Sequence, residues 1–359
     1  MSEDRLILAV NPGGTSTKLG VYRETEEVFA EVVRHTAEEL EAFDFTLDQL
    51  DFRRQVVERE LKSRNYSVDR MAAVVGRGGT FKSLQSGTYR VNEKLLADIR
   101  DGSTLQADHP SNLGAPLAYA LAEPHGKPSF FVDPVSVDEM IDEARLSGHP
   151  LLPRISLSHA LNIRMVAYKA TEDLGKNLDD TNMVVLHLGS GISVNAICKG
   201  RMIDTNNAND GGPFSPQRVG SLPTTGLMKL CCGGEYDPGQ LKKMFLKEGG
   251  LKAYTGTDHV GEARERARKG DREADLALRA MAYQIIKEAG AMAAALDGEV
   301  DCLVITGGVA HDEWMVERIS KGVEFMGRVL VFPGECELEA LVRGVLRVFD
   351  SVEQEKVYS

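Results

Sequence analysis

Three glycine-centred turns contain the residues of this sequence that are best suited to bind a phosphate. They lie at 11–18, 189–193 and 307–308, each directly after an apolar run that is expected to form a strand. Glycine lets a backbone approach an anion closely, so that its N–H groups can donate hydrogen bonds to a phosphate. The first two turns add hydroxyl groups and one positive charge. The candidate phosphate ligands are Asn11, Gly14, Thr15, Thr17, Lys18, Gly189, Ser190, Gly191, Gly307 and Gly308.

None of these turns matches a standard nucleotide-binding motif. The P-loop pattern GxxxxGK[ST] is absent from the sequence, and no GxGxxG opens a helix as it does in a Rossmann fold. A single turn of this kind is better explained as a plain tight turn. Three such turns, two of them in a repeated pattern, favour phosphate binding.

Two arginines stand in surroundings that distinguish them from ordinary surface charges. Arg77 follows an apolar run within Gly76-Arg77-Gly78-Gly79, and Arg218 belongs to the loop 205–223, which is rich in Asn, Asp, Gly and Pro. Connections of this length are commonly functional or disordered. Because a guanidinium binds carboxylates and phosphates through paired hydrogen bonds, we predict that both arginines bind an anion.

An aspartate and three histidines are further candidates. Asp133 ends a predicted strand; it fits a turn residue or a metal-linked carboxylate, since ligand crevices in α/β proteins lie at the carboxyl ends of strands. His159 begins a helix, where a capping role and a catalytic role are about equally favoured. His109 stands before Pro110-Ser111-Asn112. His187, judged only from its position before the second glycine turn, is interpreted as structural. No His or Cys cluster has metal-ligand spacing, which argues against a zinc site.

Strands and helices alternate, and the pattern of the first half returns in the second. In both halves an apolar run leads into a glycine, three further residues, a hydroxyl and another apolar run. Aligning Gly13 with Gly189 gives an offset of 189 − 13 = 176 residues and places Thr17 opposite Ser193. The alternation predicts an α/β fold, and the repeat predicts two domains of related topology.

Apolar periodicity predicts the remaining elements. Amphipathic spacing indicates helical structure over 36–70, an alanine-rich helix over 274–296 and a last helix over about 338–355. Short apolar runs predict strands at 6–10, 19–22, 72–75, 129–132, 183–188 and 300–306.

Composition argues against several classes of protein. The chain has 359 residues, 42% hydrophobic and 27% charged, which is typical of a globular protein large enough for two domains. Its net charge of −12, without a dense Lys/Arg run, argues against nucleic-acid binding. No apolar stretch reaches the roughly 18 residues of a membrane span, and the acidic N-terminus does not match a targeting peptide. Five cysteines without a CxxC pair fit a reducing cytoplasm.

Together these motifs resemble those of the acetate/butyrate kinase family, within the superfamily of sugar kinases, heat-shock chaperones and actin. The resemblance runs along essentially the whole chain, whose length is closer to that of butyrate kinases than to the longer acetate kinases. Asn11–Lys18 resembles the first phosphate motif, His187–Ser193 the second, and 306–309 the adenosine motif. A stretch similar to Gly256-Thr257-Asp258 borders the adenine in the family. The resemblance thus adds His187, Thr257 and Asp258 to the expected nucleotide ligands.

The resemblance also implies catalytic roles. Arg77 is similar to the family's substrate arginine, Asp133 to its catalytic aspartate and His159 to its catalytic histidine. Arg218 matches the second arginine, and the segment from His109 to Asn112 resembles part of the substrate pocket. The implied catalytic residues are Arg77, Asp133, His159 and Arg218, and the implied substrate ligands are Arg77, His109 and Asn112.

The fold implied by the resemblance is α/β, with two domains of duplicated ribonuclease-H-like or actin-like topology and a ligand cleft between them. Residues 1–155 would form an N-terminal acyl-substrate domain and 156–337 a C-terminal nucleotide-binding domain. The C-terminal helix, about 338–359, would pack back on the first domain. Family members use ATP or ADP with Mg²⁺ and associate as homo-oligomers, dimers or larger, so we expect the same of this chain.

One departure concerns the metal. The family tends to have an acidic pair near the C-terminus that helps to hold magnesium, whereas this chain reads Glu335-Cys336-Glu337. Asp133 and Glu337 are therefore the expected magnesium contacts, and Cys336 stands where an acid is expected.

The expected reaction is transfer of the terminal phosphate of ATP to a short-chain carboxylic acid, butyrate or a branched relative, or the reverse. Two other functions stay open on the sequence alone. A sugar or polyol kinase would use Asp133 as a base for a hydroxyl group, and an actin- or chaperone-like ATPase would act through protein partners. The choice among acetate, propionate, butyrate, isobutyrate and other branched acids also stays open.

Overall fold

The computed structural model describes residues 5–359, which form two compact units. Unit 1 contains the chain up to Asp138 together with 336–359, and unit 2 contains Glu139–Glu335. The boundary expected near residue 155 thus falls within unit 2, because the segment after Asp138 packs with the later part of the chain: Ile141 N–H donates to Ile203 O at 3.0 Å.

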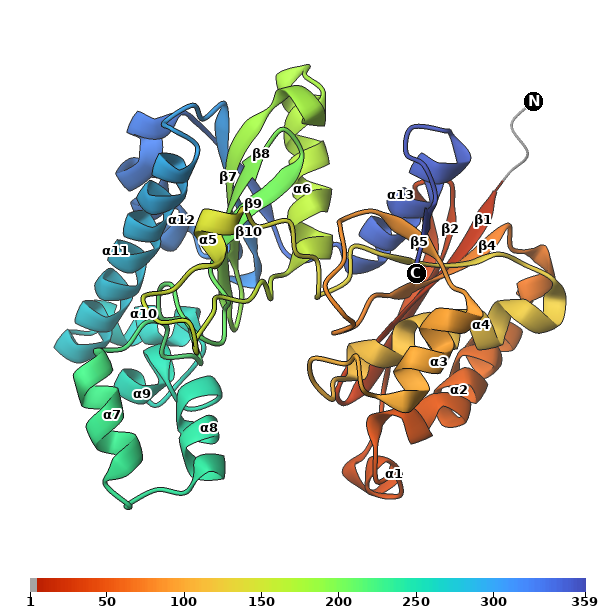
Figure 1. The fold of residues 1–359 in the computed structure, drawn as a ribbon, viewed down its shortest axis with the longest axis horizontal. Coiled ribbons are helices and arrows are strands. Elements are labelled where there is room, and N and C mark those ends of the chain that lie inside the picture. The colour runs from red at the N-terminus through yellow and green to blue at the C-terminus, as the bar shows by residue number, and fades with distance from the viewer. Residues whose placement is uncertain (1–4) are drawn as a thin grey trace. The chain divides into compact units, whose positions relative to one another are not determined.

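Unit 1 is built on a seven-stranded mixed sheet in the order β12-β5-β6-β4-β1-β2-β3 (Figure 1). β1 pairs antiparallel with β2 and parallel with β4, which continues parallel to β6. The strands are β1 Leu6–Pro12, β2 Ser16–Arg23, β3 Glu26–Arg34, β4 Ala73–Arg77, β5 Thr88–Arg90, β6 Ser129–Val132 and β12 Lys356–Val357.

Helices cover both faces of this sheet (Figure 1). Alternate residues of β1 point to opposite faces, so Leu6, Leu8 and Val10 pack in one core with α2 and α4, while α13 covers the other face. The helices of unit 1 are α1 Ala37–Glu41, α2 Leu50–Ser63, α3 Glu93–Asp101, α4 Gly114–Ala122 and α13 Glu337–Phe349, with 3₁₀ turns η1 Thr46–Gln49, η2 Val68–Arg70, η3 Pro110–Leu113 and η4 Glu123–His125.

Unit 2 is built on a five-stranded sheet in the order β11-β10-β7-β8-β9. β7 pairs antiparallel with β8 and parallel with β10, which continues parallel to β11. The strands are β7 Asn182–Leu188, β8 Ile192–Cys198, β9 Arg201–Thr205, β10 Cys302–Gly307 and β11 Arg328–Pro333.

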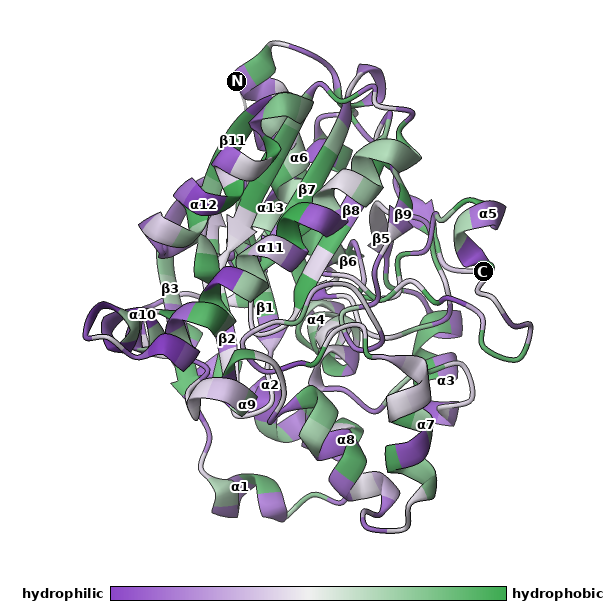
Figure 2. Cartoon of the chain, turned by 90° about the vertical axis from the view of Figure 1, so that its left-hand side faces the viewer, coloured by the Kyte–Doolittle hydropathy of each residue, from purple (hydrophilic) through white to green (hydrophobic). Residues whose placement is uncertain are grey.

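The helices of unit 2 also cover both sheet faces. Val184, Leu186 and Leu188 face α11, whereas His187, on the other face of β7, contacts α6. Figure 2 shows β7 mostly in the green of hydrophobic residues. The helices are α5 Asp142–Arg145, α6 Ala160–Leu174, α7 Thr224–Cys232, α8 Pro238–Leu246, α9 Gly250–Thr255, α10 Val260–Arg268, α11 Arg272–Ala295 and α12 Glu313–Val323, with 3₁₀ turns η5 Leu178–Asp180, η6 Gly308–His311 and η7 Glu324–Met326.

The two sheets share one topology over five strands. The order β3-β2-β1-β4-β6 in unit 1 matches β9-β8-β7-β10-β11 in unit 2, with the same parallel and antiparallel pairings. The shared order confirms the two domains of related topology that the sequence repeat predicted, and it agrees with the duplicated fold that the family resemblance implied. In the described part of the chain, no helix combines the length and apolar character that crossing a membrane would require.

The strands predicted from apolar runs are found with small shifts in their ends, but the helical prediction for 36–70 is only partly correct. Four short pieces replace one helix there, and the longest, α2, covers 14 residues. Thr36 caps α1, which ends after one turn, because the backbone then breaks at Phe43–Phe45 before η1 begins. The charged residues that suggested an amphipathic helix lie largely on the surface of these pieces.

Candidate active site

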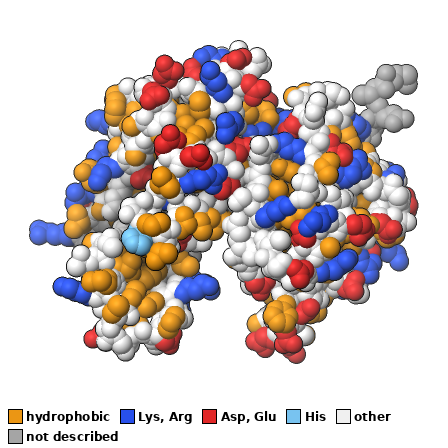
Figure 3. Space-filling model, viewed as in Figure 1, with side chains coloured by type: hydrophobic (Ala, Val, Ile, Leu, Met, Phe, Trp, Pro, Cys, Tyr) orange, Lys and Arg blue, Asp and Glu red, His pale blue; other side chains and the backbone are white. Residues whose placement is uncertain are grey.

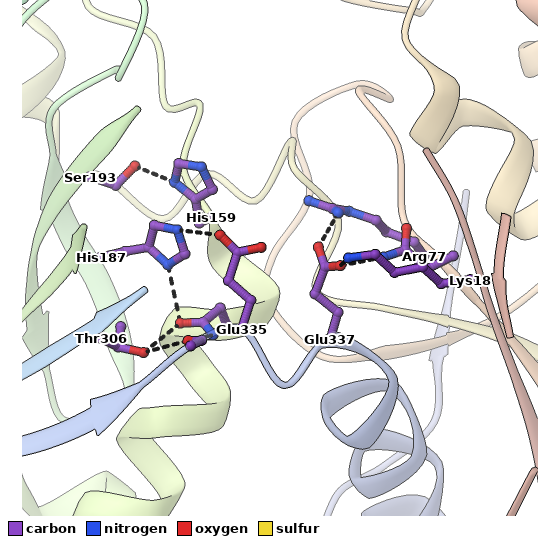
Figure 4. Close-up of polar contacts among 11 residues, drawn as sticks. Lys18, Arg77, His159, His187, Ser193, Thr306, Glu335 and Glu337 are labelled. Atoms are coloured by element: carbon purple, nitrogen blue, oxygen red, sulfur yellow. Dashed lines mark hydrogen bonds and ion pairs between the residues drawn. The ribbon is translucent and has the colours of Figure 1, made fainter. Parts of the chain in front are cut away.

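Glu337 is the centre of a charged cluster in unit 1 (Figure 4). The residue is only 8% exposed, and both of its carboxylate oxygens have partners. Oε1 forms an ion pair with Arg77, while Oε2 accepts from Asn11 Nδ2 at 2.5 Å and lies 3.0 Å from Lys18 Nζ. Glu337 begins α13, so the C-terminal segment brings this carboxylate to the ends of β1, β2 and β4. The cluster contains the predicted residues Asn11, Lys18, Arg77 and Glu337.

Arg77 keeps donors available for a ligand. Only its Nη1 is engaged, by Glu337, among the described residues, and its side chain is 22% exposed. Arg77 is positioned by a close approach of two backbone segments, the end of β4 and the start of α4. A Cβ on Gly76 would lie 1.9 Å from Gly114 O, and one on Gly114 would lie 2.1 Å from Arg77 O. Glycine at both positions lets the start of α4 contact the end of β4.

Asp133 is held by its neighbour across the sheet. Its Oδ1 accepts from Gly87 N at 2.7 Å, and its own N–H donates to Gly87 O at 3.0 Å. The residue is 3% exposed and has a φ of 37°, a conformation that costs a non-glycine residue energy and is often found at functional sites. The carboxylate is thus fixed at the carboxyl end of β6.

The predicted substrate segment divides into an exposed and a buried part. His109 is exposed and caps η3, where its Nδ1 accepts from Ser111 N at 3.2 Å. Asn112 is fully buried: its Oδ1 accepts from Thr80 N at 2.8 Å, and its Nδ2 donates to Ala107 O at 2.9 Å. Asn112 therefore ties the segment after Arg77 to the start of η3.

The turn between β1 and β2 contains the other candidates of unit 1. Gly14 and Thr15 are exposed, whereas Thr17 is fully buried. Thr17 Oγ1 lies 2.8 Å from His35 Nε2 and accepts from Arg53 Nη1 at 3.0 Å. Thr17 thus anchors the turn from inside the unit, and only its exposed neighbours can meet a ligand directly.

Unit 2 contains a pocket of about 510 Å³ at the ends of its central strands. Four of the predicted nucleotide ligands line it, namely Gly189, Ser190, Asp258 and Gly308. Thr257 precedes Asp258, and its hydroxyl donates to Glu262 at 2.6 Å. Nine lining residues were not named as nucleotide ligands: Pro216, Gln217, His259, Val260, Gly261, Val309, His311, Asp312 and Glu335. Of these, Gln217 lies next to Arg218 in the loop already singled out, and this proximity is the signal that could have found it.

Glycine is required at two positions beside this pocket. Gly307 has a φ of 90°, and a Cβ there would lie 2.4 Å from Leu188 O, so β10 and β7 approach closely where they end. A Cβ on Gly191 would lie 2.4 Å from Arg218 Nη1. The Arg218 side chain therefore lies directly against the β7–β8 turn. Burial lowers the pKa of Arg218, and no hydrogen bond or ion pair of its guanidinium is found within residues 5–359.

His159 and His187 are stacked with ring centroids 3.9 Å apart and planes at 12° (Figure 4). His159 Nδ1 lies 2.9 Å from Ser193 Oγ. His187 Nδ1 lies 3.1 Å from Asn162 Oδ1, and its Nε2 lies 3.2 Å from Glu335 Oε1. His187, which was interpreted as structural from its position in the sequence, therefore packs on His159 and orients this expected catalytic histidine.

Magnesium fits the residues at the strand ends of unit 1. Mg²⁺ prefers oxygen ligands, keeps several waters and is usually bound through one or two carboxylates plus substrate phosphates. Asn11 Oδ1 is buried and has no hydrogen-bond partner among the described residues, while Asp133 and Glu337 supply carboxylates. Within residues 5–359 no three His, Cys, Asp or Glu side chains gather as a metal cage. If Glu337 contacted the metal directly, the metal would replace one of its present partners, Arg77, Asn11 or Lys18.

Comparison with known proteins agrees with this fold and these motifs. The solved structure of Porphyromonas gingivalis acetate kinase has a TM-score of 0.77 to this chain at 20% identity, covering 96% of this chain and 100% of the other. The architecture is therefore the two-unit α/β fold of that enzyme.

Sequence comparison defines the family. A family model described as the acetokinase family matches residues 156–332. Butyrate kinase 2 of Clostridium acetobutylicum is 43% identical over 353 residues, covering 98% of this chain and 99% of the relative. A probable butyrate kinase of Listeria innocua is 44% identical with the same coverage. The chain belongs to the acetokinase family, and these two full-length relatives are named butyrate kinase 2 and probable butyrate kinase.

Proposed function

We propose that this protein transfers the terminal phosphate of ATP to a short-chain carboxylic acid, giving an acyl phosphate and ADP, and catalyses the reverse reaction when those products are supplied. The observation that carries the proposal is Arg77, whose partly exposed guanidinium has donors left over after its ion pair with Glu337. Such a group suits a carboxylate substrate. The full-length relationship to butyrate kinases supports the same reaction.

The acceptor needs no general base. A carboxylic acid has a pKa of about 4.3, judged from the glutamate side chain, so the substrate is ionised at neutral pH and is already a nucleophile. The difficulty is the approach of one anion to the polyanionic nucleotide. Arg77 would hold the substrate carboxylate and offset this repulsion, and Asn112 would keep the segment that follows Arg77 in place.

Charge on the transferring phosphoryl group would be stabilised by residues of unit 2. Arg218 lies against the β7–β8 turn, and its guanidinium has no partner in the described part of the chain, so its donors are available to the equatorial oxygens. His159 would donate to the same group, with its ring held by Ser193 and by the stacked His187. Preorganised donors of this kind are usually the largest contribution to catalysis of such transfers.

Mg²⁺ would be held by Asp133, by Glu337 and by the phosphates, with Asn11 accepting from a bound water. When bound, the ion would supply positive charge that stabilises the phosphates of the nucleotide. The adenosine part of the nucleotide would occupy the pocket lined by Gln217, Asp258 and Gly308.

The proposal also covers which carboxylic acid the enzyme prefers. The relatives' names favour a four-carbon acid, and a branched acid is the alternative. Each methylene group of a substrate changes discrimination by only about 1–3 kcal/mol, so several acids are expected to react at different rates.

The test is an assay with ATP, Mg²⁺ and hydroxylamine, comparing acetate, butyrate, isobutyrate and glycerol. Hydroxamate formed from an acid shows that an acyl phosphate was made, and the relative rates rank the acids. Release of ADP with glycerol, without hydroxamate from any acid, would contradict the proposal and favour a kinase of hydroxyl groups.

We also propose that the protein works in the cytoplasm as a homo-oligomer. All five cysteines are free thiols, which fits a reducing compartment. Helices α7 and α8 bury none of their residues, and hydrophobic side chains gather over this part of unit 2 (Figure 3). A second copy of the chain is the proposed cover for this surface, and light scattering of the purified protein measures the assembly.

A further inference from the structure

Arg53 is a buried arginine whose donors all bind neutral oxygens. It lies on α2 and is 0% exposed. Nε and Nη2 donate to Gln49 Oε1 at 3.0 and 2.8 Å, and Nη1 donates to Ser16 O at 2.8 Å and to Thr17 Oγ1 at 3.0 Å. Nη2 also donates to Gly13 O at 2.8 Å. These bonds use all five N–H groups of the guanidinium.

The charge of Arg53 has no carboxylate beside it among the described residues. Burial alone lowers its pKa to about 10, so the side chain is protonated at neutral pH. Two half-buried arginines have acidic partners: Arg347 pairs with Glu353 at 2.9 Å, and Arg264 pairs with Asp312 at 2.9 Å. A buried charge without a counter-charge destabilises a fold, so its position calls for an explanation.

The explanation lies in the turn that Arg53 holds. The carbonyl oxygens of Gly13 and Ser16 are turned inward to the guanidinium, and the Thr15 carbonyl accepts from His35 N at 2.9 Å. Gly14 and Thr15 are exposed, and their own N–H groups make no hydrogen bond within residues 5–359. The turn thus presents free N–H donors outward, with a fixed positive charge behind it. This arrangement is suited to an anion.

We infer that Arg53 is a positioning residue for a phosphate-binding turn at 13–17, and that the anion which balances its buried charge is the terminal phosphate region of the bound nucleotide. The inference rests on the proposed function, because it assigns this turn to ATP. Arg53 does not touch the phosphate; it acts by holding the turn's carbonyl groups away from the ligand and by adding positive potential.

A purely structural role predicts something different. If Arg53 only stabilised unit 1, its replacement would lower the melting temperature and affect all nucleotides equally or none. If Arg53 positions the turn, the loss of binding affinity must depend on the number of phosphates in the nucleotide. The affinity for AMP, whose adenosine part is proposed to occupy the pocket of unit 2, should then be insensitive to the change.

The experiment measures dissociation constants of ATP, ADP and AMP by calorimetry for the wild type, Arg53→Lys and Arg53→Gln. Arg347→Lys is the matched control, because it alters a half-buried arginine of the same unit that has its own acidic partner. Arg53→Lys keeps the charge but cannot make five donor contacts, so we expect ATP to bind about tenfold more weakly, with AMP unchanged and the control like the wild type. Arg53→Gln should have a larger effect.

Equal weakening of ATP and AMP, or unchanged ATP binding in Arg53→Lys, would overturn the inference. If Arg53→Gln does not fold, the lysine variant decides the matter. The hydroxamate assay on the wild type separates this result from the proposed function. A wild type that makes no acyl phosphate refutes the function, whereas a phosphate-dependent binding loss in Arg53→Lys still supports the role of the turn.

Discussion

The two units use one strand topology but end their strands with different chemistry. Strand pairing defines which positions correspond: Asn11 pairs with Lys18 in unit 1, and His187 pairs with Ser193 in unit 2. The parallel pairings extend this match to the next strands. The corresponding positions are Asn11 and His187, Lys18 and Ser193, Arg77 and Thr306, and Asp133 and Pro333.

This comparison shows that the charged residues at these corresponding strand ends belong to unit 1. Unit 1 places a lysine, an arginine and an aspartate at its strand ends, where unit 2 has a serine, a threonine and a proline. The charged positions suit a carboxylate, a phosphoryl group and Mg²⁺, whereas the neutral positions and their glycines suit close packing around a nucleotide. The shared backbone therefore supplies the location of each site, and the side chains supply its chemistry.

The two central turns also differ by one residue. The offset between corresponding positions is 187 − 11 = 176 in the first strands but 193 − 18 = 175 in the second. The β7–β8 turn is thus one residue shorter, and the alignment of Thr17 with Ser193 is wrong by one position. The longer turn in unit 1 is the one that Arg53 supports from within.

Arg218→Ala should have the largest effect, because it removes a guanidinium of unit 2 that has no hydrogen-bond or ion-pair partner within residues 5–359. We expect kcat to fall about 100- to 1,000-fold, while the ATP dissociation constant changes only a few-fold. Steady-state kinetics and calorimetry measure the two quantities. Equal losses in both would contradict a role specific to the transition state.

Arg77→Thr gives unit 1 the residue that unit 2 has at this position. The KM for the acid should rise about 100-fold, since the substrate carboxylate loses paired, charge-assisted hydrogen bonds, and the KM for ATP should stay close to that of the wild type. Arg90→Thr is the control, because this arginine of the same sheet pairs with Glu355 on the surface. A rise in the KM for ATP alone would remove Arg77 from the acid site.

Gly307→Ala tests the close approach of strand ends in unit 2. The added Cβ would meet Leu188 O, and alanine is strained at a φ of 90°, so unfolding should become easier by about 1–3 kcal/mol. Gly308→Ala is the matched control, because nothing lies within 4 Å of its added Cβ. Thermal melting without nucleotide compares them, and equal melting temperatures would contradict this view of the glycine pair.

Cys336→Asp should have the smallest effect. Cys336 is exposed beside Glu337, and an aspartate there would add the oxygen ligand that Mg²⁺ prefers. The Mg²⁺ concentration for half-maximal activity should fall by about two- to threefold, because an exposed carboxylate contributes only modestly. Cys336→Ser, which adds no charge, is the control and should leave this concentration unchanged.

Much of the fold follows from local sequence. The strand predicted at 129–132 matches β6, the apolar run at 183–188 differs from β7 by one residue, and His159 directly precedes α6 as expected. These predictions succeed because a short apolar run between polar turns has few alternatives to a buried strand. Local signals also placed Arg77 and Asp133 at strand ends.

Helical structure was less predictable where the chain lies on the surface. The segment 36–70 has helical periodicity, yet residues 43–45 break it between α1 and η1. Charged residues tolerate several surface conformations equally well, so their spacing constrains the backbone weakly. Contacts with the sheet determine which turns of helix form.

The sequence by itself determined the strand repeat, the glycine turns and the arginine and aspartate that end two strands, because each depends on neighbours within a few residues. Only the tertiary structure decided which distant side chains complete these positions. Glu337 meets Asn11 and Arg77 across more than 250 residues, and Arg53 reaches the 13–17 turn from another element. These contacts arise from packing helices on a sheet, and packing brings together residues whose separation along the chain contains no periodic signal.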